Sequence, residues 1–446
     1  MSDQEVTLDE FVEDNENGWS EKKLRNLLKK EEAGVWGDEP NDSGVKVLRA
    51  TNYAKNTIDL NDVAIRDVPE SKKDSKRLAE GDIILERSGG SAEQPVGRVL
   101  FFDLEGEYYH GNFLRQLRPD ATKINLRYLY YILDYDYRRG HTKPLQTNTT
   151  NIRNLQYSSY LNQNIPSPPL PEQRKIATVL YTVDRAIAKS EEIRDRIYRV
   201  KQGVLQDVLA EGIQDHDLTE AKLGPKSVTF PEKWEITTLG DVSTKMRNGF
   251  VGTATPHYSD KDDAVPYLQS FNVRENRVEN RKEMEQVNLS FHKDNPKTQI
   301  KAGDLLTVQS GHIGTSCVVP PEYDGANCHA LIITRVQDDK VNPHFVSQFL
   351  NSKIGEDLIK SITVGTTVDH LNVKEFKNMR FPLPPLSEQN SIVSILSDFD
   401  KRIQKEEFVT ERLQRLKRGL LQDLLSGTVR TTNTNIEVPD KIAQHG

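Results

Sequence analysis

The chain has 446 residues, of which 35% are hydrophobic and 28% are charged, and its formal net charge is −7. This length allows two to four domains, and the composition is typical of compact domains beside exposed helices. Without a run of about 18 apolar residues or a basic and apolar leader, we expect neither a membrane span nor a signal peptide. The two cysteines, Cys317 and Cys328, favour free thiols in a reducing compartment, so we expect a cytoplasmic protein.

Most of the negative charge lies at the N-terminus. Residues 1–42 carry 13 acidic and 5 basic side chains, a net charge of −8, whereas the other 404 residues carry a net charge of +1. We expect the acidic segment to be solvated or to bind a partner. Because the body is close to neutral, it cannot rely on a large cationic surface of its own to bind nucleic acid.

Residues 1–166 are predicted to form a mixed α/β domain that begins with the acidic segment. The stretches 45–53 (VKVLRATNY) and 78–90 (LAEGDIILERSGG) read as short β-rich runs bounded by polar turns. Residues 126–135 (LRYLYYILDY) read as a short helix. The Thr/Asn-rich segment 146–156 (QTNTTNIRNLQ) then leads to a proline-rich strap.

The strap and a long helix, predicted over 167–213, occur twice in the chain. PPLPEQRKI at 168–176 returns as PPLSEQNSI, and the 37 residues of 173–209 align without a gap on 389–425 with 15 identities. Two or three identities would be expected by chance, so the pattern indicates an internal duplication. Each proline strap cannot continue a helix backwards, so each helix is predicted to begin just after it.

Apolar residues recur at steps of three and four in both helices, which predicts a narrow coiled-coil seam along each. A helix of this length spans roughly 55 Å. Ser190 and Glu406 interrupt the seam. The helices either pair with each other or pack separately, each on its own domain. The predicted seam residues are Ile176, Leu180, Val183, Ile187, Ile197, Val200, Val204 and Val208 in the first helix, and Ile392, Leu396, Phe399, Ile403, Leu413, Leu416, Leu420 and Leu424 in the second.

The second half of the chain repeats this plan. Patches such as IKAGDLLTVQSGH at 300–312 echo the first domain, while most of the domain sequence has diverged. The predicted parts are a linker at 214–229, a second domain at 230–382, a second strap and helix at 383–427, and a flexible C-terminal tail at 428–446.

No catalytic residues or metal ligands are predicted. The sequence has no G-x-x-x-x-G-K-[ST] loop and no Cys/His array with zinc spacing; Cys317, Cys328 and His329 come nearest. Ser-Pro-Pro-Leu at 167–170 is similar to the target-base loop of amino-methyltransferases, but it lacks the aromatic residue that stacks on the base. We therefore interpret it as a rigid strap.

Two variable domains, each followed by such a strap and by a helix ending in a phrase like GLLQDLLSG, resemble the specificity subunit of type I restriction–modification systems. FPEKWEITTLGDV at 230–242 and QSGHIGTS at 309–316 are also similar to that family. In the first domain, Gly18-Trp19 and Leu24 match the opening phrase poorly. The resemblance covers nearly the whole chain.

The resemblance implies a mixed α/β (α+β) fold with two target-recognition domains, separated by two long antiparallel coiled-coil helices related by a pseudo-two-fold repeat. It implies a subunit without catalytic activity, in which each domain reads half of a bipartite DNA target and the helices set the gap. Two methyltransferase subunits would dock on it and use S-adenosylmethionine. Restriction subunits, when present, would use ATP and magnesium.

Base readout favours Arg, Asn and Gln side chains in polar turns, whereas contacts with phosphate position the protein without specifying sequence. The predicted base-reading residues are Arg87, Ser88, Gln146, Asn148, Asn151, Arg247, Asn248, Gln309, Ser310, His312, Thr367 and His370. The predicted phosphate contacts are Arg138, Arg139, Lys143 and Lys245. Helix pairing or subunit docking is predicted for Ile176, Leu180, Ile187, Leu205, Gln206, Asp207, Ile392, Leu396, Ile403, Leu421, Gln422 and Asp423.

Two other classes of function remain open. A coiled-coil adaptor that does not read DNA sequence would share the paired helices, and neighbouring genes would separate it from a specificity subunit. A self-sufficient modifying enzyme is the other class; the missing cofactor motifs argue against it, and the purified chain alone would then methylate or cut DNA.

Overall fold

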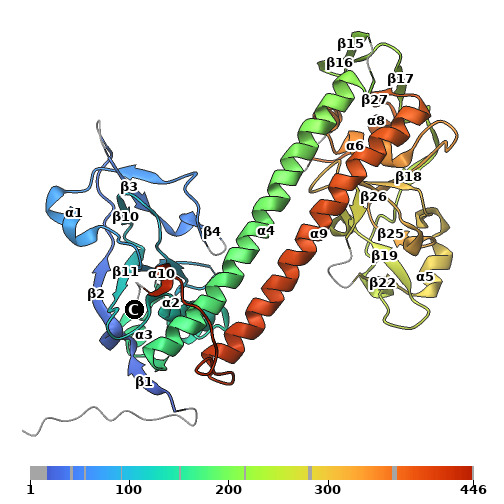
Figure 1. The fold of residues 1–446 in the computed structure, drawn as a ribbon. Coiled ribbons are helices and arrows are strands. Elements are labelled where there is room, and N and C mark those ends of the chain that lie inside the picture. Colours follow the sequence, from blue (N-terminus) through green and yellow to red (C-terminus); the bar gives the residue numbers. More distant parts are fainter. Residues whose placement is uncertain are drawn as a thin grey trace, which may run out of the picture. The chain divides into compact units, whose positions relative to one another are not determined.

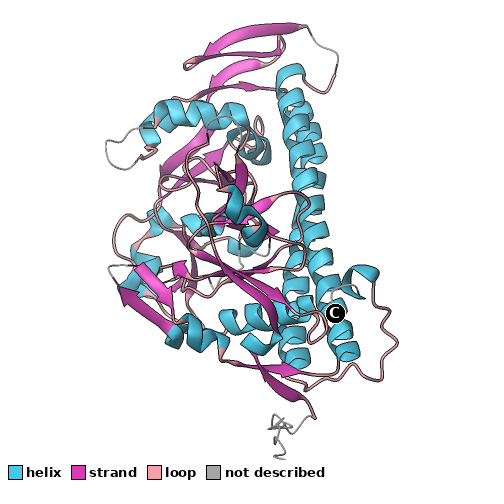
Figure 2. Ribbon diagram, turned by 90° about the vertical axis from the view of Figure 1, so that its left-hand side faces the viewer, coloured by secondary structure: helices cyan, strands magenta, loops and turns pink. Residues whose placement is uncertain are grey.

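The computed structural model describes residues 18–40, 44–54, 57–91, 93–149, 152–214, 217–279, 284–363 and 369–443. The chain divides into two compact units. Unit 1 comprises residues 1–189 and 409–446, and unit 2 comprises residues 190–408. Both units mix strands and helices (Figure 1; Figure 2). Two long helices, α4 (Leu170–Glu211) and α9 (Leu386–Leu425), contribute residues to each unit.

Unit 1 contains short strands in several sheets, and short helices. Its helices are α1 (Glu70–Lys76), α2 (Leu126–Arg138), α3 (Tyr157–Leu161) and α10 (Asp440–Ala443). Its strands are β1 (Ser20–Lys23), β2 (Leu28–Ala33), β3 (Val45–Leu48), β4 (Tyr53–Ala54), β5 (Thr57–Ile58), β6 (Ala64–Arg66), β7 (Ile83–Glu86), β8 (Ser88–Gly89), β9 (Val99–Phe101), β10 (Tyr108–His110), β11 (Leu114–Pro119), β12 (Gln146–Thr149), β13 (Ile152–Leu155) and β14 (Asn164–Ser167). The order β2-β11-β7-β9 forms an antiparallel sheet, and the order β10-β3-β6 forms a second sheet in which β10 and β3 are parallel.

Unit 2 has the same plan. Its helices are α5 (Leu289–Asp294), α6 (Pro343–Leu350), α7 (Lys353–Ile362) and α8 (Val373–Lys377). Its strands are β15 (Leu218–Leu223), β16 (Lys226–Pro231), β17 (Glu235–Thr238), β18 (Ser243–Asn248), β19 (Val265–Leu268), β20 (Val273–Arg274), β21 (Arg277–Val278), β22 (Gln286–Val287), β23 (Leu305–Val308), β24 (Ser316–Val318), β25 (Asn327–Cys328), β26 (Leu331–Val336) and β27 (Arg380–Leu383). The sheet β18-β26-β23-β24 repeats β2-β11-β7-β9, and β19 pairs in parallel with β25 as β3 does with β10.

A buried ion pair marks the equivalence of the two sheets. Asp82, just before β7, accepts hydrogen bonds from Arg118 at 2.7 and 2.9 Å, and Asp304, just before β23, accepts from Arg335 at 2.6 and 2.7 Å. Bidentate pairs of this kind are among the stronger polar contacts in proteins. The predicted mixed α/β fold with an internal repeat is therefore confirmed.

Within each unit a buried ion pair joins α4 to α9. Lys417 Nζ lies 2.6 Å from Asp184 Oδ1 in unit 1, and Lys201 Nζ lies 2.6 Å from Asp400 Oδ1 in unit 2. Both pairs occupy positions that are identical in the two copies of the helix sequence. Each aspartate also accepts a hydrogen bond from its own domain, from the Tyr131 hydroxyl in unit 1 and from an α6 amide in unit 2.

The residues that interrupt the predicted seam meet in unit 2, where the Ser190 hydroxyl donates to Glu406 Oε2 at 2.7 Å. The contact further along α4, from Lys201, reaches an earlier residue of α9, Asp400, than the contact from Ser190 does. These helix segments are therefore antiparallel. The seam prediction is wrong at Val200 and Leu416, which are half-exposed, at 49% and 51%. The lysines one position later are buried instead. The seam residues that are buried are Ile176, Leu180, Val183, Ile187, Val208, Ile392, Leu396, Ile403 and Leu424, together with Leu205 and Leu421.

The strap is held by one buried glutamine in each copy, whose side-chain amide both donates and accepts a hydrogen bond. Gln173 donates to the Pro168 carbonyl at 2.7 Å and accepts from the Asn125 N–H at 2.8 Å. Gln389 donates to the Pro384 carbonyl and accepts from the Asn342 N–H, both at 2.8 Å. Both asparagines cap the helix that follows them, α2 or α6. The repeated Glu-Gln phrase thus fastens the strap to the first turn of a domain helix.

The first domain opens with the same structural elements as the second, although its opening sequence matches the opening phrase of the family poorly. Trp19 and Trp234 are both buried, at 2% and 3% exposure. The strand after each tryptophan, β1 or β17, pairs antiparallel with the strand that leads into the strap, β14 or β27. Trp19 and Leu24 therefore take the places of Trp234 and Leu239.

The segments predicted to be a linker and a flexible tail both contain structured residues. The predicted linker at 214–229 contains the hairpin β15–β16, whose Leu223 and Val228 join the core of unit 2. The described part of the predicted tail packs on unit 1: Arg430 binds Glu172 through two hydrogen bonds of 2.8 and 2.7 Å, and Ile442 is fully buried. Hydrophobic and paired charged side chains in these segments explain why the flexible-tail prediction was wrong.

Strand β10 places a histidine in the core of unit 1. His110 is 0% exposed, its Nε2 lies 3.4 Å from the Glu32 carbonyl, and its Nδ1 has no hydrogen-bond partner among the described residues. Burial lowers the pKa of His110 to about 4, so the folded chain holds the neutral ring. Cys328 occupies the equivalent place in unit 2, since His110 pairs with Leu48 as Cys328 pairs with Leu268.

Acid is therefore expected to destabilise unit 1. In the unfolded chain His110 has a pKa near 6.5, so unfolding takes up a proton below that pH, and the stability is lost as pH falls from about 6.5 towards 4. The loss between pH 7.5 and pH 5 is about 2 kcal/mol for this group. Urea titrations at the two pH values should show it in the wild type and not in the variant His110→Cys; an equal loss in both would contradict the assignment.

Candidate functional site

A polar turn follows the same strand in each domain: the first polar turn (residues 87–90) follows β7, and the second polar turn (residues 309–312) follows β23. In the first, the Ser88 hydroxyl donates to Asn154 Oδ1 at 2.7 Å. In the second, the Ser310 hydroxyl lies 2.9 Å from His370 Nδ1. The structure therefore brings each serine against a polar side chain that stands 13 residues before the strap in sequence.

The backbone around the two polar turns is the same. The Leu155 N–H donates to the Arg87 carbonyl at 2.8 Å, and the Leu371 N–H donates to the Gln309 carbonyl at 3.0 Å. Gly89 and the equivalent glycine of the second turn both have positive φ angles, 107° and 86°, which other residues rarely adopt. One backbone frame thus presents Arg-Ser with Asn in the first domain, and Gln-Ser with His in the second.

In unit 1 several predicted residues surround an open hollow of about 410 Å³. Lys143, Gln146 and Asn148 line it together with Arg153, which the sequence analysis did not single out. Gln146 Nε2 lies 3.5 Å from the Thr142 carbonyl, while its Oε1 has no partner among the described residues. Amide and guanidinium groups around one hollow are the groups that read adenine and guanine edges.

In unit 2 the predicted residues are more constrained. Gln309 is 2% exposed, and its amide donates to Asn248 Oδ1 at 3.1 Å and to the Leu371 carbonyl at 3.0 Å. Arg247 donates to the Gln299 carbonyl at 2.7 Å, and burial lowers the pKa of its guanidinium. Gln309 thus holds the second turn in place, whereas Asn248, Ser310 and His370 remain on its surface.

Two of the predicted phosphate contacts already interact with other side chains, and the other two are exposed. Arg138 Nε donates to Asp134 at 2.7 Å, and the Arg139 guanidinium lies 5.2 Å from the centre of the Tyr135 ring. Lys143 and Lys245 are exposed. The predicted readers Asn151 and Thr367 lie outside the described residues. The roles assigned to all of these residues stay predictions.

The sequence profile of the type I restriction modification DNA specificity domain matches residues 4–199 and again residues 231–415. The chain belongs to this specificity family. A putative specificity subunit of the MjaX type I restriction enzyme of Methanocaldococcus jannaschii is 24% identical, over 92% of this chain and 94% of the relative. The EcoKI specificity subunit of Escherichia coli K12 is 26% identical, over 90% and 86%.

The fold is also that of a solved member of the specificity family. The crystal structure of the type I restriction–modification S subunit from M. genitalium superposes with a TM-score of 0.58 at 14% sequence identity, over 94% of this chain and 98% of that one. At this level of identity, the agreement concerns the fold alone.

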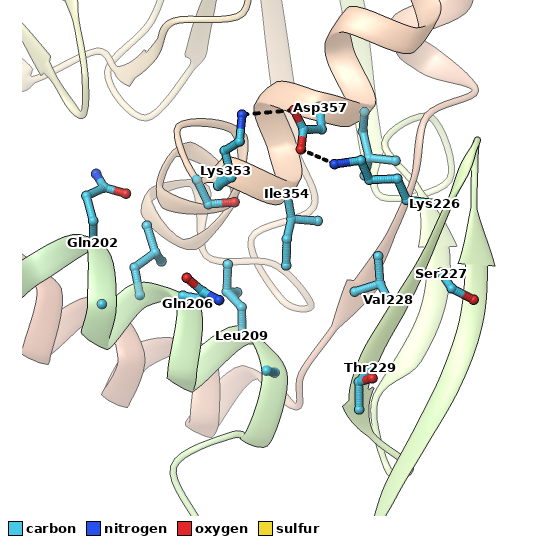
Figure 3. A pocket seen from close by; sticks show the side chains of 15 residues that line it. Gln202, Gln206, Leu209, Lys226, Ser227, Val228, Thr229, Lys353, Ile354 and Asp357 are labelled. Carbon is cyan, nitrogen blue, oxygen red and sulfur yellow. Dashed lines mark hydrogen bonds and ion pairs between the residues drawn. The ribbon is translucent and has the colours of Figure 1, made fainter. Parts of the chain in front are cut away.

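In this specificity-family chain, the polar residues predicted for subunit docking point away from the helix seam. Gln206 and Asp207 are exposed, as is Gln422. Figure 3 shows Gln206 and Leu209 on α4 beside a groove of about 440 Å³, whose other walls come from β16 and the start of α7. At its rim Asp357 contacts both Lys353, at 3.1 Å, and Lys226 (Figure 3).

No helix in the described part of the chain is long and apolar enough to cross a membrane. The described residues also contain no group of three or more His, Cys, Asp or Glu side chains that could hold a metal ion, and the thiols of Cys317 and Cys328 are buried and unpaired.

Sequence reasoning missed Asn154. It stands 216 positions before His370, which is also the spacing between the two straps and between Leu155 and Leu371. Extending the gapless alignment of the helices backwards through the strap would therefore have paired Asn154 with His370. Composition alone drew attention to Asn148 and Asn151 instead.

Proposed function

We propose that this chain selects the DNA target of a type I restriction–modification complex, with each domain reading one half of a bipartite site. The observation that carries the proposal is the pair of polar turns: one backbone frame occurs twice, with Ser88 and Asn154 in one domain and Ser310 and His370 in the other. Asparagine and histidine offer different donors and acceptors to base edges. Equivalent frames with different side chains are what two different half-sites require.

The long helices are proposed to set the gap between half-sites and to hold the partner subunits. Helices of 42 and 40 residues are roughly 60 Å long, which is enough to span two half-sites and a gap. The exposed Gln206 and Gln422 stand at identical positions in the two copies, so one kind of methyltransferase subunit could dock twice. The groove beside Gln206 is the proposed docking place in unit 2.

The chemistry is assigned to the partners. Methyltransferase subunits would bring S-adenosylmethionine, and restriction subunits, when present, would bring ATP and magnesium. The acidic residues 1–42 and the near-neutral remainder fit a chain that leaves much of the phosphate attraction to other subunits.

The test is to map methylated sites in DNA treated with this chain co-purified with its neighbouring methyltransferase. We expect two short motifs at a fixed gap. Replacing residues 230–382 by the second domain of another specificity subunit should change one motif only, because each domain carries its own polar turn. The paired variant Ser310→Ala and His370→Ala should relax the same motif.

Inserting seven residues into both α4 and α9 supplies a second arm of this experiment. Because seven residues add two helical turns, the gap should lengthen while both motifs stay the same. An active complex with an unchanged gap would contradict the role of the helices. A folded complex that enriches no motif would instead favour an adaptor that does not read sequence.

A further inference from the structure

Among the described residues, three phenylalanines are at least 36% exposed: Phe113, Phe271 and Phe408. Single exposed apolar side chains are common and need no explanation. Two of these three, however, are tied to the polar turns, one in each domain. Phe408 lies on α9 instead.

Phe113 is held against the first polar turn by its backbone. Its carbonyl accepts from the N–H groups of Arg87, at 2.8 Å, and Ser88, at 3.1 Å. Its own turn is closed by the Leu114 N–H, which donates to the Gly111 carbonyl at 2.9 Å. The ring is 52% exposed and borders an open hollow of about 400 Å³. An apolar ring therefore projects from a rigid loop directly beside the proposed base-reading side chains.

Phe271 belongs to a different loop, which is hydrogen-bonded to the second polar turn. It sits in a short 3-10 turn, Ser270–Asn272, that is fixed by the buried Asn272, whose Oδ1 accepts from the Gln269 N–H at 2.9 Å. His312 of the second polar turn donates from Nε2 to the Ser270 carbonyl at 3.0 Å. Phe271 is 36% exposed.

The two phenylalanines are not copies of each other. Phe113 lies between β10 and β11, whereas Phe271 follows β19, where the first domain has Thr51 in the equivalent 3-10 turn. Duplication therefore does not account for an aromatic ring beside both polar turns. A shared task does.

We propose that Phe113 and Phe271 act as apolar wedges, each entering or capping a base step in the half-site that its domain reads. This inference rests on the proposed function. Phenylalanine has no hydrogen-bonding group and cannot read a base edge, but an apolar side chain inserted at a step unstacks it and kinks the duplex. Pyrimidine–purine steps deform most easily, so the wedges would favour such a step at positions that make no hydrogen bond to the protein.

The test uses the complex of full-length chain and methyltransferase on its mapped target, with 2-aminopurine placed at successive positions other than the methylated bases. Unstacking raises the fluorescence of this base. We expect a rise at one step in each half-site. Phe113→Ala should abolish it in the first half-site only and weaken binding about tenfold, since base–aromatic stacking is worth about that much. Phe271→Ala should do the same in the second.

Phe408→Ala is the matched control, because it removes an equally exposed ring far from either polar turn in sequence, and it should change neither signal. Phe113→Trp should retain the first signal. A wild-type complex that selects its target without any fluorescence rise outside the methylated bases would overturn the wedge, and so would a rise in the first half-site that survives Phe113→Ala. Failure to select any target would instead count against the proposed function.

Discussion

Replacing Lys201 by methionine is expected to lower the free energy of unfolding of unit 2 by about 3 kcal/mol. Lys201 is 2% exposed and its partner Asp400 is 19% exposed, so the variant leaves a carboxylate without its cation in a largely dry site. Removing one member of a buried pair costs about 3–5 kcal/mol, and the partial exposure of Asp400 places the expected loss at the lower end. Hydrogen exchange of unit 2 amides across a urea series measures it.

An exposed pair on α9, the helix that carries Asp400, supplies the control. Lys401 and Asp398 are 3.3 Å apart and mostly exposed, so Lys401→Met should cost well under 1 kcal/mol. The double variant Lys201→Met, Asp400→Asn should lose less than the two single variants added together, because neither charge is then left alone. Additive losses would show that the two residues do not act as a pair.

Removing residues 428–446 is expected to destabilise unit 1 by on the order of 5 kcal/mol. The cut removes fully buried Ile442 and the Arg430 guanidinium. Burial opposes ionisation of Glu172, yet Arg430 outweighs it and holds the pKa of Glu172 below its usual value, so the truncated chain keeps a buried carboxylate without its partner. Asn125 also loses its 3.0 Å bond to the Ile442 carbonyl.

Amides of unit 1 should exchange faster in the truncated chain, while those of unit 2 keep their rates. Arg430→Met should reproduce part of the loss. Unchanged exchange after the cut would show that the tail does not support the unit.

Much of the architecture was predictable because the sequence repeats the strap and the long helix. The straps, the helices and the mixed α/β character of both domains follow from the gapless alignment and from short β-rich runs, and all are confirmed. The seam prediction failed where a lysine is buried. Apolar periodicity places Val200 in the core and Lys201 in solvent, whereas the structure buries Lys201 in its ion pair with Asp400 and leaves Val200 exposed.

The candidate site was only partly predictable. Arg87, Ser88, Gln309 and Ser310 lie in patches that the two domains share, so turn chemistry pointed to them. The partner of Ser88 could not be read locally, because Asn154 lies 66 residues away on another strand. Sequence alone also does not show that Gln309 is buried and holds its turn together, because exposed polar residues of the neighbouring turns have similar side chains.

The packing of the last residues on the first domain has a consequence for synthesis. Unit 2 is finished once residue 408 has left the ribosome, whereas unit 1 waits for α9 to end and for Ile442 to arrive. The N-terminal domain, although made first, is therefore the last to complete its fold, and part of its apolar core stays uncovered in the interval. A chain that stops before Ile442 would leave that core uncovered, and exposed apolar surface of this kind promotes aggregation.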